Sequence, residues 1–307
     1  MRRRRRRRTA APFPFLRKGC RTSRVPPTPL VPPIHKIGVF DSGFGGLTVL
    51  KALLEAAPAA EYLYFGDTAR LPYGSKSVVT VAKYACEAAL FLEQEGAGLL
   101  VVACNTATAL ALDEIRRRVS VGVLGVVEPG AEEAARASRS RKAVVIGTEA
   151  TISSRAYRHA LEKRQVEACE KACPLLVPLV EEGWTDHPVT EQVARIYLKE
   201  AFADGFDSAD VLLLGCTHYP LLKPLLRRVV PERMTLVDSA ESTALAVANV
   251  LGGEANRPDP GAAGEGSPSA SGEVRFFVTD SVQKFERLGK LFLGRAIANV
   301  THVALKE

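Results

Sequence analysis

Two cysteines of this 307-residue chain stand where an apolar run gives way to small polar residues, a setting suited to thiol chemistry. Cys104 follows LLVVA (99–103) and Cys216 follows VLLLG (211–215), and each precedes a polar residue and an expected helix start. Backbone N–H groups and the partial positive charge of a helix start lower a thiol pKa from its usual value of about 8.5. We therefore expect some thiolate at one cysteine while the other keeps its proton.

The two cysteine segments look like one feature used twice, 112 positions apart and one in each half of the chain. An internal duplication would let each strand end point its thiol into a shared cleft. A thiolate and a thiol on opposite faces of one carbon can remove a proton from one side and deliver a proton to the other. This chemistry is stereoinversion by two bases, without a nucleophilic intermediate.

Each thiol needs a partner that orients it. Asp41 ends the expected strand IGVF (37–40) and could serve Cys104 if the two strands are neighbours, although it could equally be the N-cap of the next helix. His218 lies two residues after Cys216 and could serve that thiol, although a lone loop histidine is usually a surface or structural residue. We expect both to support the thiols.

Small polar residues follow the same strand ends near expected helix starts, namely Ser42, Asn105, Thr106 and Thr217. Backbone amides together with hydroxyl or amide side chains can bind a carboxylate there without a full cation. Each residue alone would be read as a helix cap. Four in matched places favour an anion site.

Strand and helix patterns alternate along the folded part. Short apolar runs separated by Gly-rich turns and amphipathic segments predict strands at 37–40, 61–67, 99–103, 174–183 and 211–215. They also predict a strand followed by a turn within 142–151 and within 235–243, and a strand followed by a helix within 273–294. We expect VGVLGVVEPG (121–130) to close the first set of elements and a helix to begin near Ser153 or Ser154 in the second set. Such alternation implies parallel sheets covered by helices, with ligands at the carboxyl ends of the strands. The predicted fold is α/β, with two pseudo-symmetric Rossmann-like domains and the active site in the cleft between them.

The expected domains are discontinuous. Residues 36–130 and 240–307 should form the first domain and residues 131–239 the second, because the last strand and helix return to where the chain began. The segment LGGEANRPDPGAAGEGSPSASG (251–272), which includes the predicted loop 253–272, has the composition of a flexible loop.

The basic charge is confined to the N-terminal arm. Twelve of the 41 lysines and arginines lie in the first 36 residues, which contain no acid, and this leaves 29 basic against 34 acidic residues elsewhere. We interpret residues 1–35 as a disordered Arg/Pro-rich tail. Nucleic acid is then conceivable as a partner only through this tail. No apolar run reaches the roughly 18 residues typical of a membrane helix, so we expect a cytoplasmic protein with no membrane partner.

The other cysteines give no metal or disulfide signature. Cys169 and Cys173 are four apart with no further ligands at suitable spacing, which favours surface or structural thiols over zinc ligands. We expect neither a metal nor a cofactor.

At these motifs the sequence resembles the glutamate racemases of the aspartate/glutamate racemase superfamily. The similar segments are FDSGFGGLTVL (40–50), GDTARLPYG (66–74), ACNTATA (103–109), VPLVEEG (177–183), GCTHYPLL (215–222) and VTDSVQKF (278–285). They occur in the family's order, and the similarity spans about 36–252 and 273–307. The arm and the 253–272 loop depart from the family pattern without touching these motifs.

The resemblance implies cofactor-independent interconversion of L- and D-glutamate, which supplies D-glutamate for peptidoglycan synthesis and so for cell-wall biogenesis and cell shape. It implies Cys104 and Cys216 as the proton donors and acceptors, with Asp41, His218 and Glu181 assisting and Glu182 as the alternative to Glu181. It implies substrate binding by Asp41, Ser42, Tyr73, Gly74, Asn105, Thr106, Thr217 and His218. The expected partner is glutamate, with a homodimer possible.

Other functions stay open at this point. Racemases acting on aspartate or hydantoins and decarboxylases with one cysteine are the nearest rivals, and two cysteines argue against the latter. A dinucleotide-binding protein would explain the strand, the turn DSGFGG (41–46) and Asp67, but the glycines do not fit G-x-G-x-x-G. A nucleic-acid-binding protein would depend on the arm alone.

Overall fold

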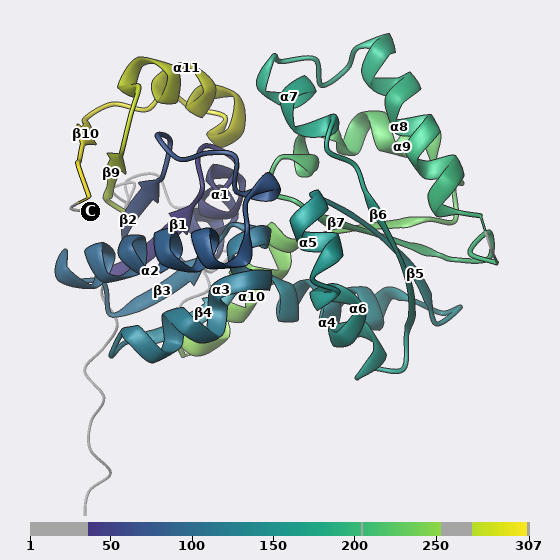
Figure 1. The fold of residues 1–307 in the computed structure, drawn as a ribbon, viewed down its shortest axis with the longest axis horizontal. Coiled ribbons are helices and arrows are strands. Elements are labelled where there is room, and N and C mark those ends of the chain that lie inside the picture. Colours follow the sequence, from purple (N-terminus) through teal and green to yellow (C-terminus); the bar gives the residue numbers. More distant parts are fainter. Residues whose placement is uncertain (1–35, 204, 253–271, 306–307) are drawn as a thin grey trace, which may run out of the picture. The chain divides into compact units, whose positions relative to one another are not determined.

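The computed structural model describes residues 36–203, 205–252 and 272–305, in which helices cover two parallel sheets (Figure 1). The N-terminal arm and most of the 253–272 loop lie outside the described residues. The α/β class with two parallel-sheet domains is confirmed. Among the described helices none is long and apolar enough to cross a membrane.

The first sheet has six strands in the order β10-β9-β2-β1-β3-β4, all parallel. Its strands come from both ends of the chain: β1 (Lys36–Asp41), β2 (Glu61–Gly66), β3 (Leu99–Val102), β4 (Gly122–Gly125), β9 (Val274–Val278) and β10 (Val300–His302). The associated helices are α1 (Leu47–Ala56), α2 (Val78–Gln94), α3 (Asn105–Arg118) and α11 (Val282–Leu293). The predicted return of the last strand to the first sheet is thus correct.

The second sheet has four parallel strands in the order β6-β5-β7-β8. They are β5 (Lys142–Gly147), β6 (Glu167–Ala172), β7 (Val211–Gly215) and β8 (Thr235–Asp238). The helices among and beside them are α4 (Val127–Ala137), α5 (Glu149–Ser153), α6 (Ala156–Glu162), α7 (Leu176–Glu181), α8 (Pro188–Ala201), α9 (Lys223–Val229) and α10 (Ser239–Val250).

Helix α10 links the two groups of strands, because it packs against α1 as well as α4 and β7. Helix α4 packs against β7 and β8, although we assigned its first residues to the first domain. The expected boundaries after residues 130 and 239 stay a prediction.

Buried strands explain why the sheets are parallel. All residues of β3 and β7 are buried, and LLVV and VLLLG have no polar position that could face water. Strands covered on both faces read as continuous apolar runs, and helical crossovers cover both faces of a parallel sheet. The carboxyl ends of β1 and β3 therefore meet at one sheet edge, as do those of β5 and β7.

The predicted strand at 174–183 is wrong, since this segment forms the short helix α7. Pro178 has no N–H to give to a sheet ladder but is tolerated in the first turn of a helix. Leu176 and Val180 are buried at the i, i+4 spacing of a helix face. The apolar run was ambiguous, and the proline should have decided it.

The helix expected near Ser153 or Ser154 begins earlier. Thr148 caps α5 at its N-terminus, and Arg155, with a positive φ of 57°, separates α5 from α6. The same segment therefore holds two short helices, and the residue after β5 is a cap.

Candidate active site

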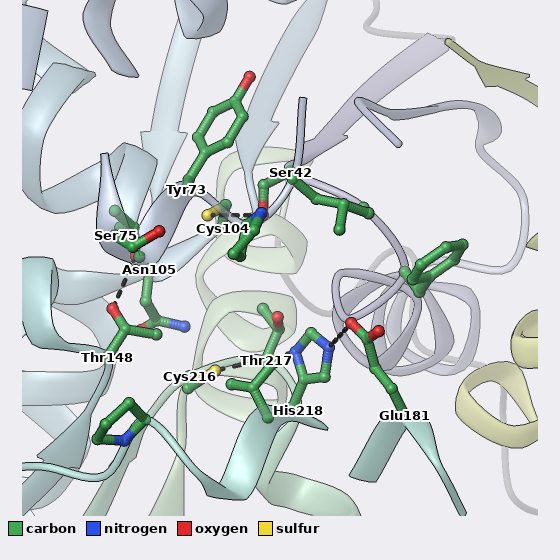
Figure 2. Close-up of a pocket in the computed structure, with 18 of the residues that line it drawn as sticks. Ser42, Tyr73, Ser75, Cys104, Asn105, Thr148, Glu181, Cys216, Thr217 and His218 are labelled. Carbon is green, nitrogen blue, oxygen red and sulfur yellow. Dashed lines mark hydrogen bonds and ion pairs between the residues drawn. The ribbon is translucent and has the colours of Figure 1, made fainter. Parts of the chain in front are cut away.

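A cavity of about 170 Å³ lies where the carboxyl ends of the two sheets face each other. It brings together ten of the predicted site residues: Ser42, Tyr73, Gly74, Cys104, Asn105, Thr106, Glu181, Cys216, Thr217 and His218. Asp41 is not part of the lining, and its side chain is buried at the end of β1. Figure 2 shows the sulfurs of Cys104 and Cys216 on different sides of this cavity.

Strand register sets the Cys104 side. Phe40 of β1 pairs with Val102 of β3, so the two strands are neighbours, as the prediction for Asp41 required. Cys104 is the N-cap of α3, where its Sγ accepts a hydrogen bond from the N–H of Ala107 at 3.5 Å. The same sulfur donates to Ser42 Oγ at 3.5 Å.

The Cys104 thiol does not have the low pKa that its position at a helix start suggested. Burial and the nearby Asp41 carboxylate raise its pKa to about 12, and its hydrogen bonds with Ser42 and Ala107 offset this only in part. Desolvation disfavours the charged thiolate more than one helix terminus can favour it. Cys104 is therefore a protonated thiol at neutral pH.

Asp41 lies beneath the cavity floor. Its Oδ2 accepts a hydrogen bond from the N–H of Gly43 at 2.9 Å, whereas its Oδ1 is buried without a hydrogen-bond partner among the described residues. Burial raises the pKa of this carboxyl, opposed by the charge of His218 and by backbone N–H groups. The free oxygen leaves Asp41 able to accept a proton on the Cys104 side.

The Cys216 side is a line of three groups. Cys216 Sγ is 3.9 Å from His218 Nδ1, and His218 Nε2 is 3.2 Å from Glu181 Oε1 (Figure 2). Glu181 ends α7, and it contacts His218, whereas the alternative Glu182 is exposed. The glutamate therefore reaches the site from a helix and not from the strand we expected.

His218 is charged in this setting. Burial by itself lowers its pKa, but the hydrogen bonds and charges of Cys216 and Glu181 outweigh burial and raise the pKa to about 10. An imidazolium beside a sulfur stabilises negative charge on that sulfur. The two cysteines thus have opposite surroundings, a buried carboxylate at one and a cation at the other.

The groups between the two sulfurs are polar and uncharged, and they suit an anionic part of a ligand. Asn105 and Thr106 begin α3, where free N–H groups and the helix dipole favour negative charge. The Asn105 amide is fixed because its Oδ1 accepts from Tyr157 Oη at 2.6 Å and its Nδ2 donates to Ser239 Oγ at 3.3 Å. Among the described residues that line the cavity there is no lysine or arginine.

A hydroxyl cluster joins the two halves and was missed from the sequence. Thr106 Oγ1 is 2.9 Å from Thr148 Oγ1 and 3.1 Å from Thr151 Oγ1. Thr148 directly follows β5 and lines the cavity, so the strand-end rule that found Thr217 would have found it too. Ser75 and Glu149 also line the cavity and gave no signal in the sequence.

The loop that holds Tyr73 and Gly74 is tied to a buried carboxylate. Asp67, fully buried after β2, accepts hydrogen bonds from Tyr73 Oη at 2.5 Å, Arg70 Nε at 2.8 Å and Thr279 Oγ1 at 2.9 Å. A Cβ on Gly74 would lie 2.8 Å from Thr148 Cβ, so only glycine allows this loop to approach the second half so closely. Asp67 therefore positions one wall of the cavity.

Gly45 is also required to be glycine, because there the first half of the chain lies against the segment that holds His218. A Cβ on Gly45 would lie 2.2 Å from Thr217 Oγ1 and 2.6 Å from His218 Nδ1. The turn DSGFGG is thus explained by contact with the second cysteine segment, which removes the main argument for a dinucleotide site.

No cluster of histidine, cysteine, aspartate or glutamate within the described residues could hold a metal ion. Among the cysteines with described positions, Cys86, Cys104, Cys173 and Cys216 form no disulfide. Cys173 is buried and Cys169 is partly buried.

Comparison with known proteins assigns the chain to a family. The model of the Asp/Glu/hydantoin racemase family matches residues 37–247. A glutamate racemase of Koribacter versatilis is 59% identical over 286 residues, which cover 88% of this chain and 97% of that protein. Among solved structures, a glutamate racemase of Bacillus anthracis is 36% identical with a TM-score of 0.78 over 88% of this chain and 97% of its own.

A second solved structure, the glutamate racemase of Francisella tularensis in complex with D-glutamate, is 33% identical with a TM-score of 0.77. It is matched over 89% of this chain and 98% of its own. With paired cysteines on one cavity between two parallel-sheet domains, the chain belongs to the glutamate racemases of the Asp/Glu/hydantoin racemase family.

Proposed function

We propose that this protein interconverts L- and D-glutamate by two-base proton transfer at Cα, with Cys104 and Cys216 as the two bases. The observation that supports this most directly is that the two thiols, from two different sheets, line one cavity. The relative from Francisella tularensis is described in complex with D-glutamate, which supports glutamate as the substrate here.

The surroundings of the two thiols suggest their roles in one direction. Cys216, beside the charged His218, holds the negative charge and removes the α-proton from one face of the substrate. Cys104 keeps its proton because its pKa is raised to about 12, and it gives that proton to the opposite face. After the turnover Cys216 is a thiol and Cys104 a thiolate, which is the state needed for the reverse direction. Asp41 and His218 accept or return protons as the thiols are reset.

Binding of the substrate falls to groups between the sulfurs. Asn105, Thr106 and Thr217 with the first N–H groups of α3 suit a carboxylate and would help stabilise charge that develops next to Cα. Ser42, Tyr73 and Gly74, with Thr148, border the rest of the cavity and suit the remaining polar ends of the substrate. The D-glutamate formed would serve peptidoglycan precursor synthesis.

The test is racemisation of each glutamate enantiomer without any added cofactor, followed by circular dichroism, with deuterium exchange at Cα measured in deuterium oxide. We expect exchange and racemisation from either enantiomer and much slower turnover of aspartate. Faster turnover of aspartate than of glutamate would exclude the substrate assignment. A requirement for pyridoxal phosphate would exclude the two-thiol mechanism.

The charge on His218 predicts how stability depends on pH. Its pKa is raised from 6.5 to about 10, so its contribution to the free energy of unfolding is complete below about pH 6.5 and is lost as the pH rises through 10. Urea unfolding of wild type and His218→Asn across this range should give a stability difference that shrinks with rising pH. A difference that stays constant from pH 6 to about pH 10 would contradict a charged His218.

A further inference from the structure

The C-terminal helix α11 reaches the Cys216 side of the cavity. Phe292 of this helix packs its ring edge-on against the His218 imidazole, with centroids 5.0 Å apart. In the first turn of the same helix, Lys284 places its Nζ 3.7 Å from Glu181 Oε2. The motif VTDSVQKF therefore ends in contact with the catalytic machinery, although the proposed mechanism makes no use of it.

Glu181 divides its two carboxylate oxygens between two cations. Oε1 faces His218 Nε2 at 3.2 Å, and Oε2 faces Lys284 Nζ at 3.7 Å. Lys284 also lies over the ring of Phe44, 5.2 Å from its centroid, and Phe44 lines the cavity. Its ammonium is thus held between an aromatic face from the first half of the chain and a carboxylate from the second.

We propose that Lys284 is a positioning residue for racemisation, acting through Glu181 to orient His218 and so to support proton transfer at Cys216. The inference rests on the proposed two-thiol function. Lys284 is not among the residues that line the cavity; it holds the carboxylate of Glu181, which in turn holds the His218 imidazole. The resulting line of charges runs from Lys284 through Glu181 and His218 to Cys216.

This support is confined to one of the two bases. On the opposite side, Cys104 has Ser42 Oγ and the Ala107 N–H as partners, and Asp41 is held by backbone N–H groups. No side-chain cation is recorded within hydrogen-bond or ion-pair distance of Asp41 in the described part of the chain. Loss of Lys284 should therefore weaken transfer at Cys216 and leave transfer at Cys104 intact.

Rates alone cannot show which base is weakened. For a racemase the equilibrium constant is unity, so kcat/KM must be equal in the two directions for every variant. The primary deuterium isotope effect, measured with Cα-deuterated substrate, need not be equal in the two directions. It reports how far proton abstraction from the starting enantiomer limits the rate. Weaker transfer at Cys216 raises this effect for the enantiomer that Cys216 deprotonates and lowers it for the other.

The experiment compares Lys284→Met, Lys284→Arg and Lys290→Met, with isotope effects measured from both glutamate enantiomers. We expect Lys284→Met to lose about fivefold in kcat/KM, the upper range for a partly exposed ion pair, and its two isotope effects to diverge. Lys284→Arg keeps the charge and should stay near wild type. Lys290 is an exposed lysine on the same helix, so its variant should leave the rate and both isotope effects unchanged.

A variant on the Cys104 side makes the test specific to one base. Ser42→Ala removes a partner of Cys104 and should make the isotope effects diverge in the opposite sense. Should Lys284→Met melt well below wild type, Lys284→Gln, which keeps a polar end, replaces it.

Isotope effects for Lys284→Met that match wild type in both directions, or no loss of rate, would overturn the role of Lys284 while leaving the two-thiol function standing. A wild-type protein that does not racemise glutamate would instead overturn the proposed function, and the inference with it.

Discussion

Replacing Cys104 or Cys216 with alanine should lower racemisation of glutamate by about 10³-fold, the middle of the range for loss of a general acid or base. Each variant keeps one base, but a single base cannot remove a proton from one face of Cα and deliver one to the other. Both sulfurs line the same cavity of one chain, so mixing the two variants should not restore activity. The measurement is the rate of optical change from each enantiomer.

Cys86 provides the matched control for these variants. It is a buried cysteine on α2 that does not line the cavity, so Cys86→Ala should keep racemisation within a few fold of wild type. Retention of near wild-type racemisation by Cys216→Ala would be incompatible with two-base transfer.

Replacing Asp67 with alanine should lower the free energy of unfolding by about 3 kcal/mol and raise KM for glutamate. The substitution leaves the Arg70 guanidinium and the Tyr73 hydroxyl without the buried carboxylate that both of them contact. The wall formed by Tyr73 and Gly74 then loses its anchor to β2. Urea unfolding and steady-state kinetics measure the two effects.

Asp113→Ala is the control for the loss of a carboxylate. Asp113 is 85% exposed and pairs with Arg116 at 3.6 Å on the surface of α3, so we expect its loss to change stability by less than about 0.5 kcal/mol. If Asp67→Ala unfolded no more easily than this control, the buried network would contribute nothing to stability.

The Cys104 side of the site was predictable from sequence because local patterns specify it. A continuous apolar run marks a buried parallel strand, and the residue after such a strand lies at the ligand edge of the sheet. This rule points to Asp41, Cys104 and Asn105; the last two line the cavity, Asp41 does not, and their roles stay a prediction. It would also have placed Thr148, had it been applied to the strand KAVVIG (142–147).

The elements that were missed depend on contacts distant in sequence. Strand β6 reads EACEKA, with only Ala168 buried, because it is an edge strand and pairs with β5 alone. Glu181 contacts His218 across a sequence separation of 37 residues, so nothing in PLLVPLVEEG could reveal the contact between them. Lys284 is farther still from Glu181 in sequence, because it follows β9, the strand with which the chain returns to the first sheet.

The error about Cys104 has a physical cause. The sequence shows that the cysteine begins a helix, and this would lower its pKa. It does not show how completely the side chain is buried or that Asp41 lies beside it, and these two effects raise the pKa to about 12. Burial is a property of the assembled fold, so the direction of the shift could not be read from the motif.

The discontinuous first sheet has a consequence for how the protein is made. Until β9 emerges from the ribosome, β2 is an open edge with unpaired backbone groups, the kind of edge that pairs with other chains. The four strands of the second sheet are complete by residue 238, about forty residues before β9 ends. The helix that contacts His218 and Glu181 is translated later still. A nascent chain that ends before α11 therefore holds both cysteines without these contacts, and we expect it not to racemise glutamate.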